Sequence, residues 1–219
     1  SNCYVTVPID LIVNMPPPIN DFMTYNICAN DNNSFNLNEI NAALMDESFN
    51  VLFNYFTNEV DANTNTNALD TNYTYQTNSD ILFTRVEFST THCYLIYEFN
   101  LNVNPLPIAN LPNDLMACDD DFNGLLDVDL TQQNSSILNG QSPTLFTVTY
   151  HNTELQAQED NSALETNYMA FDSEIIYVRV EDNSTGCYSI TQFSVVINPL
   201  PEIDIEDQVI CLDNLPLMV

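Results

Sequence analysis

The sequence predicts an all-β protein made of tandem immunoglobulin-like antiparallel β-sandwich repeats with short helical turns, arranged as a rod. Two observations predict this class. Apolar and polar residues alternate in short segments, which is the period of a half-buried strand. The cysteines recur in two series, Cys3, Cys93 and Cys187 spaced by 90 and 94 residues, and Cys28, Cys118 and Cys211 spaced by 90 and 93.

Other segments recur in the same order and set the limits of the repeats. FTRVE at 83–87 corresponds to YVRVE at 177–181, and NALDTNY at 67–73 corresponds to SALETNY at 162–168. Self-similarity of this kind is the signature of a repeat architecture. We therefore expect the last strand of a preceding repeat at 1–17, complete repeats at 18–107 and 108–201, and the first strand of a following repeat at 202–219.

The segment that ends each repeat is expected to be a strand with one face in the core. The predicted inward positions are Phe99, Leu101 and Val103 in the middle copy, Phe193, Val195 and Ile197 in the last, and Ile9, Leu11 and Val13 in the first. Two short helical segments are expected in each repeat. In the second repeat they lie at 130–138, with Thr131 as a candidate N-cap, and at 152–160, with Thr153 as the N-cap.

Proline-rich linkers follow the last strands. NPLP occurs at 104–107 and again at 198–201. Proline has no N–H to donate to a strand ladder, so it ends the strand. A short proline-rich spacer is extended and stiff, and this stiffness is the basis for expecting a rod.

Composition limits the partners. Hydrophobic residues make up 45% of the chain, enough for each repeat of about 90 residues to bury its own core. The net charge is −29, and Arg85 and Arg179 are the only Lys or Arg residues. Nucleic acid and anionic membranes both require clustered basic residues, so neither is an expected partner. The sequence has no apolar run of the ~18 residues needed for a transmembrane helix, so direct membrane insertion is not expected.

The recurrence of the cysteines favours disulfides formed in an oxidising, extracellular compartment. Our preferred scheme pairs cysteines within a repeat, Cys28 with Cys93 and Cys118 with Cys187, and leaves Cys3 and Cys211 free or bonded elsewhere. The alternative joins Cys3 to Cys28, Cys93 to Cys118 and Cys187 to Cys211, which would fold each last strand and linker back on the next strand. Sequence alone leaves the connectivity open.

One acidic loop is a candidate calcium site. Its oxygen-bearing residues alternate around Gly124, and such hard oxygen ligands suit calcium: Asp119, Asp121, Asn123 and Asp127. The position where a calcium loop carries a bidentate glutamate is Leu130 here. The alternative interpretation is a solvated acidic turn. The loop of the first repeat reads ANDNNS at 29–34, and we expect no calcium there.

The few basic and imidazole side chains do not form a catalytic pattern. Arg85 and Arg179 occupy equivalent positions, each two residues before a glutamate, which favours a structural role as partners of carboxylates or carbonyls. His92 and His151 have no nucleophile or second base near them in the sequence, so we expect exposed polar residues. No catalytic or cofactor-binding residue is predicted.

The motifs of the second repeat resemble a known class of repeats. CDDDFNG at 118–124, YVRVED at 177–182 and VVINPLP at 195–201 are similar to the tandem repeats of very large surface proteins made by gliding bacteria with type IX secretion. The resemblance implies a secreted, adhesin-like chain at the cell surface. Its partners would be neighbouring repeats of the same chain, together with surface glycans or other surface proteins.

The leading functional hypothesis is a structural or adhesive repeat segment of a long extracellular filament, with a role in gliding motility or surface attachment. A glycan- or protein-binding module is one alternative. A non-catalytic appendage of a secreted enzyme is another. In none of these is the segment itself an enzyme.

Overall fold

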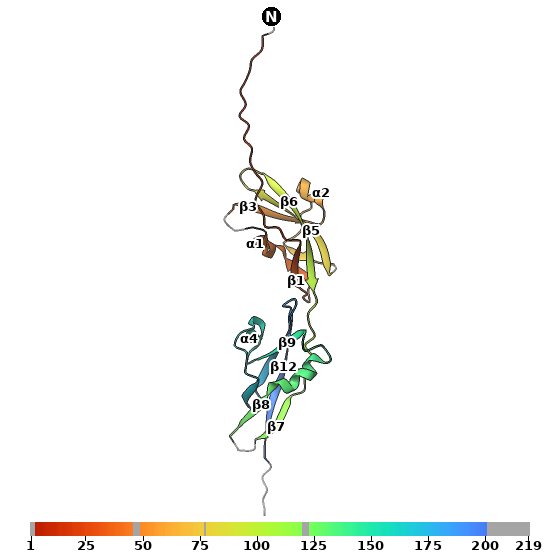
Figure 1. Ribbon diagram of the computed structural model, residues 1–219, viewed down its shortest axis with the longest axis vertical. Coiled ribbons are helices and arrows are strands. Elements are labelled where there is room, and N and C mark those ends of the chain that lie inside the picture. The colour runs from red at the N-terminus through yellow and green to blue at the C-terminus, as the bar shows by residue number, and fades with distance from the viewer. Residues whose placement is uncertain (1–2, 46–48, 77, 120–122, 201–219) are drawn as a thin grey trace, which may run out of the picture. The chain divides into compact units, whose positions relative to one another are not determined.

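The computed structural model describes residues 3–45, 49–76, 78–119 and 123–200 (Figure 1). The chain divides into two compact units, Ser1–Pro107 with Asp182–Cys187, and Ile108–Glu181 with Tyr188–Val219. Each unit contains one four-stranded sheet and one two-stranded sheet. The predicted all-β sandwich class is confirmed.

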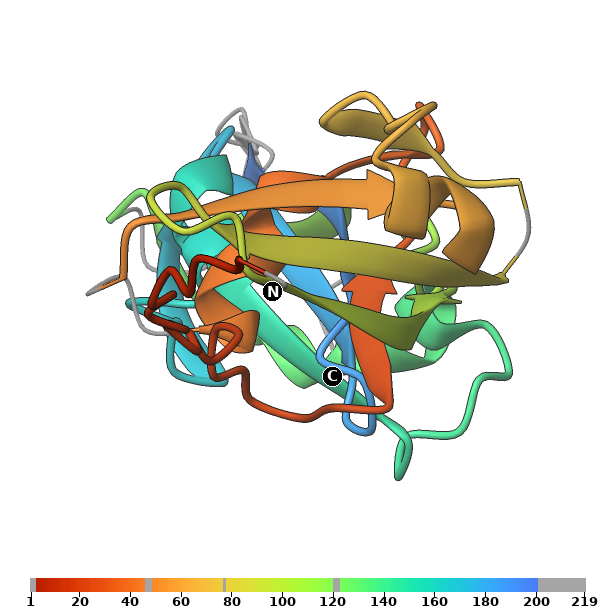
Figure 2. The ribbon, with the colours of Figure 1, turned by 90° about the horizontal axis from the view of Figure 1, so that it is seen from above.

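The first repeat alternates short strands with helical turns. β1, β6, β5 and β3 form its larger sheet in that order, β2 and β4 form the smaller one, and β3 and β5 lie side by side in Figure 2. The elements are β1 (Thr24–Cys28), β2 (Ser34–Asn36), η1 (Leu37–Ile40), α1 (Asn41–Leu44), β3 (Val51–Phe56), α2 (Glu59–Thr64), β4 (Asn72–Thr74), β5 (Ser79–Phe88) and β6 (Tyr94–Asn104).

The second repeat has the same order of elements and the same sheet topology. β7, β12, β11 and β9 form the larger sheet, and β8 pairs with β10 in the smaller one. The elements are β7 (Leu115–Asp119), β8 (Leu125–Asp129), η2 (Leu130–Gln133), α3 (Asn134–Leu138), β9 (Phe146–His151), α4 (Glu154–Glu159), β10 (Asn167–Phe171), β11 (Ile175–Asp182) and β12 (Tyr188–Pro199).

The last strand of each repeat supplies alternate side chains to the core, as the sequence predicts. Exposure is 8% or less at all six inward positions: Phe99, Leu101 and Val103 on β6, and Phe193, Val195 and Ile197 on β12. Residues 3–17 form no strand in the structure, and Ile9 and Leu11 are each 87% exposed. Their assignment to a preceding repeat stays a prediction, and residues 202–219 lie outside the described residues.

The first and last strands of each repeat are parallel. Cys28, at the end of β1, lies opposite Asn104 at the end of β6. Cys118 on β7 lies opposite Asn198 on β12 in the same way. The hairpins β5–β6 and β11–β12 are antiparallel. Local alternation of apolar and polar residues does not reveal strand direction, and the parallel pairs determine where each cysteine lies.

The helical turns cover the cores and are capped by polar side chains. Thr153 caps α4 by accepting a hydrogen bond from the backbone N–H of Gln156, which confirms the predicted N-cap. The prediction of Thr131 as a cap is wrong. Helix η2 begins at Leu130, so the cap is Asp129, whose Oδ1 accepts the N–H of Thr131 at 2.9 Å.

A buried tyrosine fastens the helical turns to the core at equivalent places. The hydroxyl of Tyr55 donates to Oδ1 of Asn41 at 2.6 Å, and the hydroxyl of Tyr150 donates to Oδ1 of Asn134 at 2.5 Å. Burial raises the pKa of both phenols well above the usual value. Both therefore remain neutral donors in the folded protein.

Arg179 forms a four-part clamp in the second repeat. Its Nε donates to Glu181 at 2.9 Å, and its Nη1 donates to the carbonyls of Ala157 and Gln158 at 3.0 and 3.2 Å. Its guanidinium lies 3.5 Å from the centre of the Tyr188 ring. Carbonyls in the last turn of a helix lack intrahelical partners, and a cation is favourable there. The clamp therefore ties α4 to β11 and β12.

Arg85 repeats these contacts in the first repeat. It donates to Glu87 at 2.8 Å and to the carbonyls of Ala62 and Asn63 at 3.3 and 3.2 Å. Its guanidinium lies 3.3 Å from the centre of the Tyr94 ring. Both arginines are buried, at 8% and 6% exposure. The geometry favours the structural role expected for the two arginines, in which each neutralises a carboxylate and satisfies helix carbonyls.

We predict that Arg179→Gln lowers the unfolding free energy of the second repeat by about 2–3 kcal/mol, because removing one partner leaves buried polar groups unsatisfied. Arg179→Lys should lose less, since it keeps the charge but not the planar fork. Calorimetry of the full chain measures both effects, with Arg85→Gln as the matched variant that lowers the transition of the first repeat. An unchanged transition in Arg179→Gln would contradict the clamp.

Candidate functional site

A disulfide joins Cys28 to Cys187, so it links residues from the two repeats. The two Cα atoms are 5.5 Å apart, and the cysteines are separated by 159 residues in sequence. A Cα–Cα distance of 5.5 Å is ordinary for a disulfide. Cys187 belongs to the second repeat by sequence, but the turn Asp182–Cys187 groups with the first compact unit. The disulfide is the most distinctive chemical feature of the described structure.

The end of β1 holds Cys28. The N–H of Ala29 donates to the carbonyl of Asn104 at 2.9 Å, which continues the parallel ladder just past the cysteine. The N–H of Asn30 donates to the hydroxyl of Tyr75 at 3.1 Å. The Asn30 side chain also bridges to the backbone of Ser34. These hydrogen bonds fix the chain directly after the cysteine, and Cys28 itself is exposed.

The turn between β11 and β12 holds Cys187, which is fully buried. The N–H of Asp182 donates to the carbonyl of Cys187 at 2.9 Å, and the N–H of Gly186 donates to the carbonyl of Asp182 at 2.8 Å. The Asp182 carboxylate accepts the N–H and hydroxyl of Ser184, at 2.8 and 2.6 Å. These bonds hold the pKa of Asp182 below its usual range. The turn is therefore a preformed support for the cysteine.

The predicted pairs Cys28–Cys93 and Cys118–Cys187 are both wrong. Cys28 lies opposite Asn104 at the end of β6, whereas Cys93 precedes β6 at its start. Along an extended strand this separation is about 35 Å, at roughly 3.3 Å per residue. A disulfide requires Cα atoms within about 7 Å. Parallel pairing of the first and last strands thus excludes a disulfide within a repeat.

The same geometry applies to Cys118. It lies opposite Asn198 near the end of β12, and Cys187 precedes the start of that strand. The alternative scheme, which joins Cys93 to Cys118 and Cys187 to Cys211, also differs from the structure. In the described part of the chain, Cys3, Cys93 and Cys118 are free thiols.

The first repeat contains an equivalent turn that ends in Cys93. The N–H of Phe88 donates to the carbonyl of Cys93 at 3.0 Å, and the N–H of His92 donates to the carbonyl of Phe88 at 3.0 Å. The Cys93 thiol donates to the carbonyl of Asn14 at 3.8 Å. These backbone bonds match those around Cys187. Cys93 is therefore held in the same kind of turn as the bonded cysteine, and its own thiol is free.

The calcium hypothesis stays a prediction. Asp121 lies outside the described residues, and Asp127 is an exposed residue of β8. The Asp119 carboxylate accepts the N–H groups of Asn123 and Gly124, at 3.2 and 2.9 Å. Over the residues that the structure describes, no group of three or more His, Cys, Asp or Glu side chains could hold a metal ion.

The histidines have structural partners. His92 is exposed, as expected, and its Nδ1 lies 2.9 Å from Oε1 of Glu87. This contact and Arg85 hold the pKa of Glu87 below its usual range. The expectation of an exposed His151 is wrong, because its side chain is fully buried. Its two ring nitrogens lie 3.0 Å from the carbonyl of Asn161 and 2.9 Å from the Thr149 hydroxyl, so both polar atoms of the buried ring have a hydrogen-bond partner.

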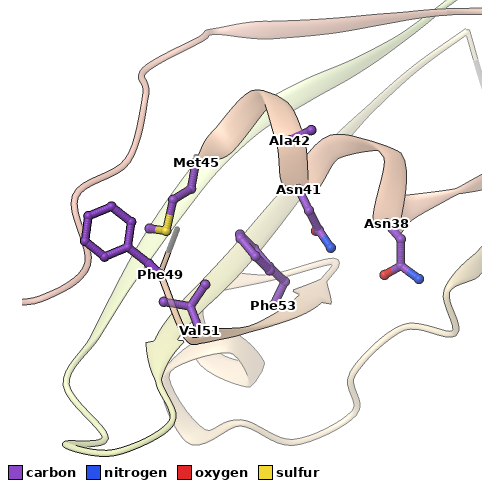
Figure 3. A pocket seen from close by; sticks show the side chains of 7 residues that line it. All are labelled: Asn38, Asn41, Ala42, Met45, Phe49, Val51 and Phe53. Carbon is purple, nitrogen blue, oxygen red and sulfur yellow. The ribbon is translucent and has the colours of Figure 1, made fainter. Parts of the chain in front are cut away.

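A hollow of about 350 Å³ lies beside α1 in the first repeat, with Met45 and Phe49 at one end and Asn38 at the other (Figure 3). A hollow of about 360 Å³ lies at the equivalent place in the second repeat, beside Asn134. The asparagines that line the two, Asn41 and Asn134, already accept hydrogen bonds from core tyrosines. The hollows therefore belong to the scaffold, and we assign them no ligand.

We predict that Gly186→Ala lowers the unfolding free energy of the chain by about 1 kcal/mol. Gly186 has φ +73°, a left-handed conformation that favours glycine over residues with a Cβ. His92 occupies the equivalent position with φ +58°. Glycine suits this conformation, so His92→Gly should not lower the unfolding free energy by the amount expected for Gly186→Ala. Urea unfolding followed by circular dichroism tests both variants, and equal losses would contradict this account of the turn.

Comparison with known proteins places these features in context. The chain is similar to the I-band fragment I67–I69 from titin, at 9% identity and a TM-score of 0.28, over 81% of this chain and 63% of that fragment. It is also similar to Drosophila N-cadherin EC1-4, at 10% identity and a TM-score of 0.20, over 69% of this chain and 42% of that one. The chain spans less than two thirds of either structure. No curated protein matches it.

A family match covers most of the chain. Residues 24–107 and 114–201 each match the Flavobacterium inter-domain disulphide bond domain. The description of this family agrees with the bond between Cys28 and Cys187. With both repeats matched from the first strand to the last, the chain belongs to this family and carries two tandem copies of its domain.

Proposed function

We propose that the chain is a structural segment of an extracellular surface filament in which each repeat is joined by a disulfide to the next. The bond between Cys28 and Cys187 is the observation that carries this proposal. It connects the first strand of one repeat with the last hairpin turn of the following repeat. Tandem domains held in this way suit a structural role.

The free cysteines support an extended series of such bonds. Cys118 occupies the position of Cys28 in the second repeat, and Cys93 occupies the position of Cys187 in the first. If the same rule applies, Cys118 bonds to the hairpin turn of a following repeat. Cys93 bonds to the first strand of a preceding one. Neighbouring repeats of the same chain are then the principal partners.

An extracellular location fits this chemistry, because disulfides persist in oxidising compartments. Among the described residues, no helix is both long and apolar enough to cross a bilayer. Adhesion or gliding motility is the use that the sequence resemblance implies for such a filament. Both histidines and both arginines take part in contacts that support the fold, which favours a non-catalytic segment.

The test is peptide mapping without reduction on a longer chain that includes a further repeat on each side. We expect Cys118 to be joined to the hairpin cysteine of the following repeat, and Cys93 to the first-strand cysteine of the preceding one. The Cys28–Cys187 peptide in the same digest is the internal control. Free thiols at Cys93 and Cys118 in that longer chain would reject the series of bonds.

A further inference from the structure

The bonded cysteines lie near the beginning of the first repeat and near the end of the second. Cys28 is the last residue of β1, the first strand of the first repeat. Cys187 immediately precedes β12, the last strand of the second repeat. The disulfide therefore closes a covalent loop that spans 159 residues and contains almost all of both repeats.

We propose that this disulfide carries tension past both hydrophobic cores, so that a pulled chain cannot be lengthened by unfolding either repeat. A force applied at the two ends enters through β1, crosses the sulfur–sulfur bond and leaves through β12. This path is covalent throughout. The loop from residue 29 to residue 186 is outside it and bears no force. The path is a property of this chain, and only its use in a filament rests on the proposed function.

The lengths involved are large. An extended chain spans at most about 3.6 Å per residue. The disulfide therefore keeps about 570 Å of chain, the 159-residue loop, from contributing to the extended length. The path from residue 18 to Cys28 and from Cys187 to residue 201 contains few residues. It can extend to only about 95 Å at the same spacing. A reduced chain would have both segments and the whole loop available for extension.

Most of the core lies on the unloaded loop. β3, β5 and β6 of the first repeat lie between the bonded cysteines, as do β8, β9, β10 and β11 of the second. The arginine clamps on β5 and β11 are also within the loop. β1 and β12 carry the load, and they remain hydrogen-bonded to strands that do not. Pulling can therefore peel two strands at most before the covalent path is taut.

Reduction would change the path completely. Without the disulfide, the described residues of the two repeats are connected only by the peptide linker after β6, and tension then runs through every strand. Each repeat could unfold and release its full length. A disulfide that merely stabilised the repeats would instead raise the force needed to unfold them and leave the released length unchanged. The released length therefore separates the two roles.

The experiment is single-molecule stretching of the full 219-residue chain, with handles ligated to peptide tags at its two ends. We expect the oxidised chain to reach a contour length about 570 Å shorter than the same chain in dithiothreitol. Only the reduced chain should show steps that correspond to unfolding of a whole repeat. An oxidised chain that reaches the reduced contour length would overturn the proposal.

Two variants make the comparison specific. Cys187→Ser should behave as the reduced chain without any reductant, and Cys93→Ser should keep the short contour length of the oxidised chain. If Cys187→Ser fails to fold, adding dithiothreitol to a single tethered wild-type molecule compares the two states directly. Loss of the short length in Cys93→Ser would also overturn the proposal. Peptide mapping of the longer chain tests the proposed filament, and stretching of the 219-residue chain tests the limit on extension. Either proposal can fail while the other holds, so the two failures are distinguishable.

Discussion

Parallel pairing of the first and last strands is the constraint on which the cysteine chemistry of this protein depends. It brings the end of β1 to the end of β6, and the end of β7 close to the end of β12. The two cysteines of a repeat follow the first strand and precede the last, so they lie at opposite ends of the sandwich. Neither can reach the other, so a disulfide to either one must come from a cysteine outside its own repeat.

The second recurring device is the buried arginine. In a chain of net charge −29, the two arginines each combine a glutamate, two helix carbonyls and a tyrosine ring. The tyrosine, Tyr94 or Tyr188, immediately follows a hairpin cysteine. The clamp therefore orders the start of the last strand, where the turn presents Cys93 or Cys187. Core packing and cysteine placement are thus connected through the buried arginine of each repeat.

The sequence predicts much of the fold because its signals are local and repeated. Alternation identified the inward faces of β6 and β12, and the threonine before α4 identified its cap. The disulfide was not predictable by the same reasoning, since strand direction depends on contacts distant in sequence. Parallel pairing of β1 with β6 puts Cys28 at the far end of β6 from Cys93. The burial of His151 is also not predictable from its neighbours alone, because one of its two hydrogen-bond partners, the carbonyl of Asn161, lies beyond α4.

The pairing of Cys28 is the most direct test of this account. The chain should be digested without reduction by a protease that cuts at acidic residues, after alkylation of free thiols, and its cross-linked peptides should be identified by mass spectrometry. We predict one peptide pair that contains Cys28 and Cys187, with Cys93 and Cys118 alkylated. Peptides that join Cys28 to Cys93 and Cys118 to Cys187 would contradict it.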